Sequence, residues 1–156
     1  AGGAGKCRML VEEFGLDCAI DYKTEDVEQA LTRIGGGIHV YFDNVGGPLL
    51  DAVLPNMAHY GRVAICGLVA TYAADSATPG PRRFDQVLMR RLSIAGLFSP
   101  DFAHRGSEYN ALLQPWLRAG RITLPFDITT GLENLLTAYA KLFTGGNIGK
   151  VLVKLS

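Results

Sequence analysis

The sequence predicts an α/β fold built on a parallel β-sheet, and two observations carry this prediction. Between residues 5 and 67, segments with the apolar spacing of helices alternate with short apolar segments typical of strands. Such alternation indicates parallel strands joined by crossover helices. The composition agrees, because 156 residues with 48% hydrophobic and 19% charged side chains are enough for a globular domain with its own core.

The first elements follow the order helix, strand, helix, strand. Apolar residues at helical spacing predict a helix within residues 5–15, and DCAIDY at 17–22 predicts a short strand. Residues 24–37 predict a second helix that Thr24 caps and a glycine run ends. The sequence IHVYFDN at 38–44 predicts the next strand.

The middle of the chain continues this order and then departs from it. GPLLDAVLPNMAHYG at 47–61 predicts a helix whose regular part ends near Pro55, and RVAICG at 62–67 predicts a strand. Residues 68–83 form a long segment without periodicity, and loops of this length are often functional. A short helix at 84–92 and a fourth strand at 93–99 are predicted next.

The last third predicts further elements of both kinds. An amphipathic helix is expected at 107–120, an extended piece at 122–126, a helix at 132–146 and a closing strand at 149–155. The chain opens on a glycine-rich turn that leads straight into a helix, without the element that usually precedes such a turn. We therefore expect a fragment, with at least one further strand upstream.

Charge and cysteine content argue against several classes of function. Fifteen basic residues balance fifteen acidic ones, which argues against a general nucleic-acid binder. No apolar run approaches the roughly 20 residues of a membrane-spanning helix. Cys7, Cys18 and Cys66 have no CxxC spacing, so a cysteine metal site is not expected, and their odd, sparse number fits reduced thiols in the cytoplasm.

Two neighbouring strands of the predicted sheet end in polar or small residues. VYFDNVGG at 40–47 ends in an acid, an amide and two glycines, and ICGLVATY at 65–72 continues past a glycine into the long loop. Open parallel sheets bind ligands beyond the carboxyl ends of their strands, and glycine lets a ligand approach the backbone. These two strand ends therefore mark a candidate ligand site, although a tight turn into a helix explains each of them alone.

Five segments resemble the zinc-independent medium-chain dehydrogenases and reductases, above all the prostaglandin reductase and alkenal or curcumin double-bond reductase branch. In order along the chain they are AGGAGKCRMLVEEFGLDCAIDYKTED at 1–26, VYFDNVGG at 40–47, GRVAICGLVATY at 61–72, GPRRFDQVLMRRLSIAGLF at 80–98 and GLENLLTAYAKLFTGGNIGKVLVKL at 131–155. The resemblance implies a Rossmann domain that binds NADPH and a separate catalytic domain.

The resemblance also implies how the chain is divided. Residues 1–120 are expected to form an incomplete Rossmann-type, doubly wound parallel sheet, and residues 121–156 to return to the catalytic domain, which the closing strand would join. The family's pyrophosphate-binding loop would lie upstream. We therefore expect the isolated chain to bind NADPH poorly and to be inactive, whereas a full-length parent protein would be active.

At the start of the chain, the resemblance assigns Lys6 and Tyr22 to the 2′-phosphate of NADPH. Lys6 stands where a glycine-rich turn enters a helix, a place that suits a phosphate. A bare ribose diol would call for an acidic residue nearby, and the turn itself contains none. The alternatives are a solvated surface lysine and an aromatic residue exposed at a strand end.

Further along, the resemblance assigns cofactor contacts to both strand ends and to two later segments. Asn44 would lie against the cofactor, Cys66, Gly67 and Tyr72 belong to the loop around the nicotinamide half, and Leu97, Phe98 and Ser99 would present backbone to the carboxamide. Asn147 would bond the cofactor from the last loop. For Asn44 the alternative is a turn residue that bonds its own backbone, and for Cys66 a small packed side chain.

The implied chemistry is hydride transfer from NADPH to the β-carbon of an α,β-unsaturated ketone or aldehyde. The carbonyl oxygen gains negative charge in this step. The candidate donors that would stabilise it are Tyr72, the candidate catalytic residue, and the nicotinamide ribose hydroxyl. No metal is expected, because the alkene is already activated. The partners implied are a small enone or enal and a second copy of the chain in a homodimer, with an exposed sheet edge to promote pairing.

Other functions remain open from the sequence. A methyltransferase also has a doubly wound sheet, but its site favours an acidic residue where Lys6 suits a phosphate. A quinone-oxidoreductase-like protein, or a nucleotide-binding protein without catalysis, fits the same pattern. Turnover of an enone by the full-length parent would separate these functions.

Overall fold

The computed structural model describes residues 1–72 and 80–155. The described chain divides into two compact units, one formed by Ala1–Lys23 with Ser107–Ser156 and the other by Thr24–Gly106, and each is described by itself. None of the helices in the described ranges is long and apolar enough to cross a membrane.

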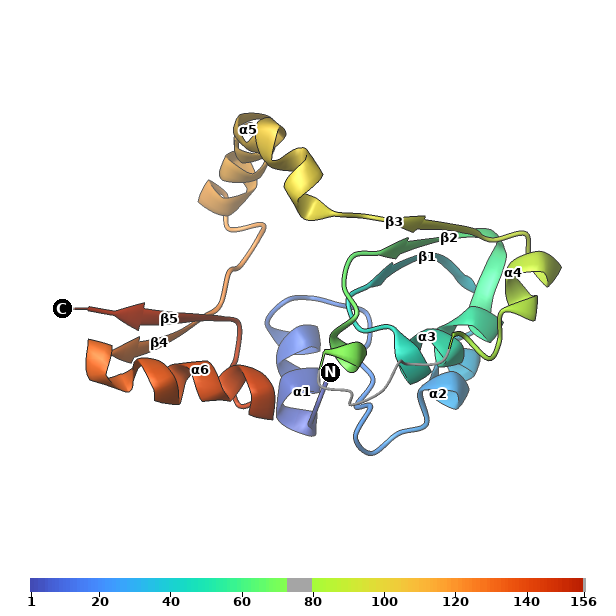
Figure 1. The fold of residues 1–156 in the computed structure, drawn as a ribbon, viewed down its shortest axis with the longest axis horizontal. Coiled ribbons are helices and arrows are strands. Elements are labelled where there is room, and N and C mark those ends of the chain that lie inside the picture. The colour runs from blue at the N-terminus through green and yellow to red at the C-terminus, as the bar shows by residue number, and fades with distance from the viewer. Residues whose placement is uncertain (73–79, 156) are drawn as a thin grey trace. The chain divides into compact units, whose positions relative to one another are not determined.

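A three-stranded parallel sheet is the centre of the unit formed by residues 24–106 (Figure 1). Its strands are β1 (Ile38–Asp43), β2 (Met57–Ile65) and β3 (Ser93–Gly96), hydrogen-bonded in that order. The predicted α/β class, the parallel pairing and the strands around Val40, Val63 and Ile94 are confirmed. The sheet is incomplete for a Rossmann-type fold, as predicted.

The register brings the three strands to an end at one level. Asp43, the last residue of β1, is paired with Ile65, the last residue of β2, and Ile65 with Gly96, the last residue of β3. Parallel strands point their carboxyl ends to the same edge of a sheet. The three segments that follow the strands therefore begin side by side.

Helices on one face of this sheet bury its core (Figure 1). They are α2 (Val27–Ile34), α3 (Gly47–Val53) and the short α4 (Asp85–Met89). The buried cluster consists of Leu50, Val53, Leu54, Met57, Val63 and Leu92. On β1, Tyr41 packs against this cluster, whereas the alternate residues Val40 and Phe42 are more than half exposed.

The predicted helix at 47–61 is too long. The helix α3 gives way to a 3₁₀ turn, η1 (Leu54–Asn56), and strand β2 begins at Met57. Pro55 has no N–H to continue the helix, as predicted. Met57 is fully buried in the cluster, so burial in the sheet outweighs the helical spacing of the residues that follow it.

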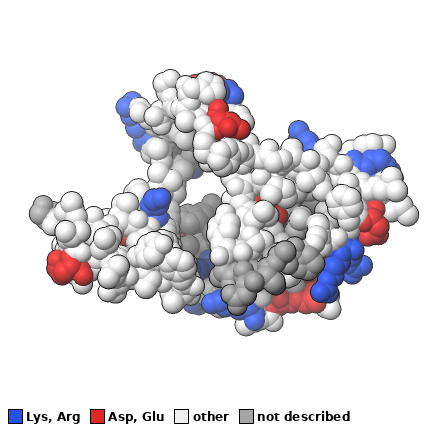
Figure 2. Space-filling model, in the orientation of Figure 1, with Lys and Arg blue, Asp and Glu red and all other residues white. Residues whose placement is uncertain are grey.

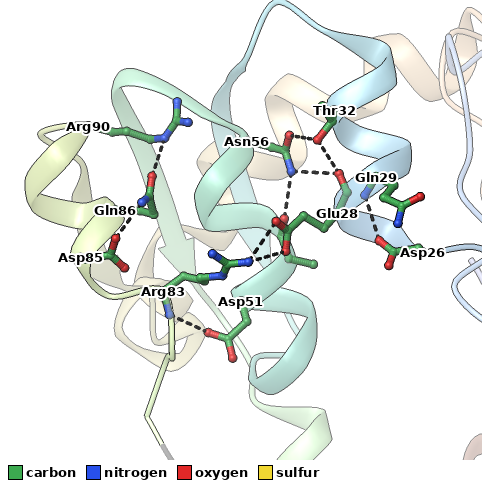
Figure 3. A network of polar contacts seen from close by, with 11 residues as sticks. Asp26, Glu28, Gln29, Thr32, Asp51, Asn56, Arg83, Asp85, Gln86 and Arg90 are labelled. Carbon is green, nitrogen blue, oxygen red and sulfur yellow. Dashed lines mark hydrogen bonds and ion pairs between the residues drawn. The ribbon is translucent and has the colours of Figure 1, made fainter.

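Polar contacts fasten the chain before α4 to α2 and α3 (Figure 3). Arg83 forms an ion pair with Glu28 of α2 (3.2 Å), and Asp51 Oδ1 of α3 accepts a hydrogen bond from the N–H of Arg82 (2.7 Å). Asn56 donates to the carbonyl of Glu28 (3.1 Å) and so ties η1 to α2. Asp26 caps α2, in place of the predicted Thr24, because its Oδ1 accepts from Gln29 N (2.9 Å).

The other unit contains three helices and a second sheet. The helices are α1 (Ala4–Glu12), α5 (Gly106–Arg118, whose first residue belongs to the sheet unit) and α6 (Leu135–Thr144); the parallel strands are β4 (Phe126–Thr130) and β5 (Lys150–Lys154). The closing strand β5 pairs with β4 and is not a member of the three-stranded sheet, as predicted. Lys141 Nζ of α6 bonds Asp127 Oδ1 of β4 (2.7 Å), and this bond lowers the pKa of Asp127.

The segment around Ala19 was predicted to be a strand, and this prediction is wrong. Residues 18–21 form neither a strand nor a helix. Their described backbone partner is Ala1, whose carbonyl accepts from Tyr22 N (3.1 Å) and whose amino group donates to Ile20 O (2.6 Å). The predicted boundary between residues 120 and 121 stays a prediction.

We expect Leu54→Ala to lower the free energy of unfolding by about 2–5 kcal/mol, because it leaves a cavity in the core cluster. Leu54 is 0% exposed, whereas Leu88 of α4 in the same unit is 77% exposed. Leu88→Ala is the matched control and should change the free energy by no more than about 0.5 kcal/mol. Urea unfolding followed by circular dichroism measures both, and equal losses would contradict the core assignment.

Candidate functional site

The turn after β1 is held by the side chain of the strand's last residue, Asp43. Its Oδ1 accepts hydrogen bonds from the backbone N–H of Val45 and of Gly46, both at 2.9 Å, and from the Tyr41 hydroxyl at 2.9 Å. Gly46 has φ 69°, a left-handed conformation that favours glycine, and it is the residue before α3. The carboxylate therefore closes the strand-to-helix turn that contains Asn44.

Backbone hydrogen bonds join this turn to the segment that follows β2. The carbonyl of Asp43 accepts from Cys66 N (2.7 Å) and Gly67 N (3.1 Å), and the carbonyl of Asn44 accepts from Val69 N (3.1 Å). The carbonyl of Val45 accepts from Ala70 N (3.0 Å). We call residues 43–47 and 66–72 the double turn, because these bonds join them at the carboxyl edge of the sheet.

Glycines make the close approach within the double turn possible. A Cβ added to Gly67 would lie 2.9 Å from the carbonyl oxygen of Asn44, and one added to Gly46 would lie 2.8 Å from a methyl carbon of Leu68. Real Cβ atoms essentially never come so near. Gly67 is therefore needed for the packing of one turn on the other, whether or not it also lets a ligand approach the backbone.

The structure brings the predicted residues of the sheet unit to this one edge. Leu97 N donates to Ile65 O (2.8 Å), so Leu97, Phe98 and Ser99 continue β3 beside the double turn. Tyr72 ends the 3₁₀ turn η2 (Val69–Thr71) and is 74% exposed, so its hydroxyl is accessible to a ligand. Cys66 is partly buried with a free thiol. The residues that follow Tyr72 in the long predicted loop, 73–79, lie outside the described residues.

In the other unit, a second turn is organised by a second aspartate. Asp21 Oδ1 accepts from Gly3 N (2.9 Å), just before α1, and from Lys23 N (3.1 Å). A Cβ added to Gly2 would lie 2.8 Å from Tyr22 Oη and 3.1 Å from Lys23 Cε. Tyr22 and Lys23 therefore lie over the glycine turn that leads into α1.

This arrangement corrects one argument from the sequence. The glycine turn contains no acid, but the fold brings Asp21, only 8% exposed, against it. Because the Asp21 oxygen that faces the turn already accepts two backbone N–H groups, it differs from an acid that faces a ribose diol. Sequence reasoning missed Asp21 and Lys23, and it also missed the structural role of the Asp43 side chain. The available signal was an acid at the end of a predicted strand, followed by a turn.

Lys6 and Asn147 both donate hydrogen bonds to backbone carbonyls of their own unit. Lys6 Nζ donates to the carbonyl of Gly145 (2.7 Å), the left-handed residue that ends α6. Asn147 Nδ2 donates to Gly149 O (2.9 Å). No side chain caps α1 and no acid lies in its first turn among the described residues, so Lys6 stands at a helix N-terminus suited to an anion.

Possible metal ligands and the distribution of surface charge are the remaining features of the described residues. No group of three or more His, Cys, Asp or Glu side chains in the described ranges could hold a metal ion. Acidic and basic side chains are interspersed on the face drawn in Figure 2.

Comparison with known proteins identifies related chains. Residues 14–153 match the family model described as zinc-binding dehydrogenase. The chain is 39% identical to 2-alkenal reductase (NADP(+)-dependent) of Nicotiana tabacum, over 100% of the chain and 46% of that protein. It is 36% identical to NADPH-dependent curcumin reductase of Escherichia coli strain K12, over 100% of the chain and 47% of that protein.

A search of solved structures also finds a related protein. The crystal structure of CurA from Vibrio vulnificus in complex with NADPH matches with a TM-score of 0.89 and 36% identity, over 100% of the chain and 48% of CurA. The chain thus spans about half the length of the relatives it matches.

We expect Gly67→Ala to lower the free energy of unfolding by about 1–3 kcal/mol, because the new methyl group forces the two halves of the double turn apart. Gly106→Ala is the control, since a Cβ there meets nothing within 4 Å. Urea unfolding of this chain measures both variants. If the urea midpoint of Gly67→Ala equals that of the wild type, the two segments of the double turn are not closely packed.

Proposed function

This chain belongs to the zinc-binding dehydrogenase family, and on that premise we propose that it is the cofactor-binding half of an NADPH-dependent double-bond reductase. The substrates would be α,β-unsaturated ketones or aldehydes. The observation that carries the proposal is the double turn at the carboxyl edge of a parallel sheet, where such sheets bind ligands. The printed names of the relatives, an alkenal reductase and a curcumin reductase, support this substrate class.

Residues of the sheet unit would receive the nicotinamide half of NADPH. Asn44 offers an amide that both donates and accepts hydrogen bonds, Gly67 leaves the backbone approachable, and the backbone of Leu97, Phe98 and Ser99 supplies further polar groups. Cys66 would line this surface as a small side chain. NADPH, when bound, supplies the hydride.

Tyr72 would act on the substrate. Its exposed hydroxyl follows the double turn and would donate a hydrogen bond to the substrate carbonyl oxygen as that oxygen gains negative charge. The step needs no Lewis acid, because the carbonyl already activates the alkene. Independence from zinc, a cytoplasmic location and a homodimer remain parts of this proposal.

Residues of the other unit would recognise the 2′-phosphate that distinguishes NADPH from NADH. Lys6 supplies a cation in the first turn of α1, and Tyr22 lies over the glycine turn before that helix. Asn147 would bond the cofactor from the loop after α6. Lys23, on the same side of Gly2 as Tyr22, adds a second cation close to that turn.

The direct test is turnover by the full-length parent, the longer protein to which we expect this chain to belong. We expect it to oxidise NADPH in the presence of a simple enone, measured by loss of absorbance at the nicotinamide band. Binding of NADPH without turnover of enones or quinones would favour the nucleotide-binding alternative. Turnover of quinones alone would favour the quinone-oxidoreductase alternative.

We expect Lys6→Ala in the parent to raise the KM for NADPH about 10- to 100-fold, because a charge-assisted contact to phosphate contributes about 1.5–3 kcal/mol. The KM for NADH should stay nearly unchanged. Lys154→Ala, at the end of β5, is the control lysine. Melting temperatures without cofactor separate this effect from the lost bond to Gly145, and an equal loss for both cofactors would contradict the assignment.

We expect Tyr72→Phe in the parent to lower kcat by about a hundredfold, the cost of one lost donor to a developing oxyanion. The KM for NADPH should change little, since the ring remains. Tyr60→Phe is the matched control, because Tyr60 lies near the other end of β2 and is 72% exposed, much as Tyr72 is. If both variants keep full activity, the ribose hydroxyl or another group is the donor.

A further inference from the structure

Asp43 is a buried acid that the proposed chemistry does not use. It is 0% exposed, and among the described residues Asp21, at 8%, is the other buried polar or charged side chain. Burying a carboxylate is costly unless hydrogen bonds stabilise it. Its position at the end of β1, next to Asn44, places this cost within the double turn.

The two oxygens of the carboxylate are used unequally. Oδ1 accepts three hydrogen bonds of 2.9 Å, from Tyr41 Oη, Val45 N and Gly46 N. Oδ2 is buried and has no partner within the described part of the chain. Burial and then the bond to Asp43 raise the pKa of Tyr41, so its hydroxyl remains a donor to Oδ1.

Asp43 also connects the two halves of the double turn through its backbone. Its carbonyl oxygen accepts from Cys66 N (2.7 Å) and Gly67 N (3.1 Å). The side chain thus sets the path of residues 44–46, and the main chain of the same residue sets where residues 66 and 67 lie. A substitution that removes the carboxylate would therefore alter the backbone of both segments.

An ordinary turn does not require such a residue. An asparagine at this position could accept from the same N–H groups without burying a charge. Hydrogen bonds to an ionised acceptor are shorter and roughly twice as strong as neutral ones. The carboxylate therefore strengthens a turn that an amide oxygen would also hold, and a fixed turn matters most where it has to fit a ligand.

We propose that Asp43 is a positioning residue, whose carboxylate holds Asn44 and the Cys66–Gly67 backbone in the shape that receives the nicotinamide half of the cofactor. This inference rests on the proposed function. It assigns Asp43 no contact with substrate or cofactor. It predicts that cofactor affinity follows the acceptor at Oδ1 and not the stability of the fold.

Three variants of the full-length parent test this inference. Asp43→Ala removes the acceptor, and Asp43→Asn keeps an acceptor oxygen while it removes the charge. Asp51→Ala is the matched control, because Asp51 Oδ1 also accepts two backbone N–H groups, those of Arg82 and Arg83, outside the double turn. The measurements are the Kd for NADPH by fluorescence titration, the melting temperature without cofactor, and hydrogen exchange of peptides that cover residues 44–47 and 66–72.

We expect Asp43→Ala to raise the Kd for NADPH at least tenfold and to speed exchange in both peptides. Asp43→Asn should restore the Kd to within about threefold of the wild type, because charge-assisted bonds become ordinary ones, even though its amide nitrogen has no partner at the Oδ2 position and lowers the melting temperature. Asp51→Ala should leave the Kd and both peptides unchanged. If Asp43→Ala does not fold, Asp43→Ser, with a shorter and weaker acceptor, replaces it with the same expectations.

Two results would overturn the inference. One is a lower melting temperature for Asp43→Ala with an unchanged Kd and unchanged exchange at 66–72, which is a purely structural role. The other is an equal loss of affinity in Asp43→Asn and Asp43→Ala. If the wild-type parent itself binds no NADPH, the proposed function fails, and the exchange of the two peptides still decides whether Asp43 holds both turns.

Discussion

The parallel register of β1, β2 and β3 is the constraint on which the candidate site depends. Because Asp43, Ile65 and Gly96 are paired across the sheet, three chain segments leave it at the same level. Segments that begin side by side can exchange backbone hydrogen bonds, and those from Asp43, Asn44 and Val45 to residues 66–70 do so. Shifting β1 by one residue against β2 would move the carbonyls of Asp43, Asn44 and Val45 out of line with residues 66–70 and break the double turn.

The two buried aspartates solve the same physical problem in the two units. A glycine turn before a helix leaves backbone N–H groups without partners, because the helix supplies none for its first turn. Asp43 accepts from Val45 and Gly46 before α3, and Asp21 accepts from Gly3 before α1. In each unit one carboxylate oxygen satisfies backbone N–H groups of the turn: Asp43 lies just before α3 in the chain, whereas Asp21 follows α1 and folds back against Gly3.

Periodicity predicted the parts of the fold whose partners lie nearby in the chain. The alternation of apolar residues was sufficient for β1, β2 and β3, since Tyr41, Val63 and Leu92 meet in one core. It failed at 17–22, which has strand-like residues but finds only Ala1 as a described backbone partner, and at 57–61, where burial of Met57 decides for a strand. In the site, residue types indicated Asn44 and Gly67, but the roles of Asp21 and Asp43 depend on contacts that no spacing in the sequence reveals.

The position of Lys6 shows how a folded chain can keep a cation ready for a phosphate. Its ammonium group donates to the carbonyl of Gly145, one of the carbonyls that the end of α6 leaves without a helical partner. A bond from the ammonium to a phosphate oxygen pairs two opposite charges, whereas its bond to Gly145 has a neutral acceptor. The Lys6 ammonium would therefore leave Gly145 and bind the phosphate. Because this side chain is already ordered, the entropic cost of binding is lower. If Lys6 binds the 2′-phosphate as proposed, Gly145 would contribute to the choice of cofactor by ordering this side chain before the phosphate binds.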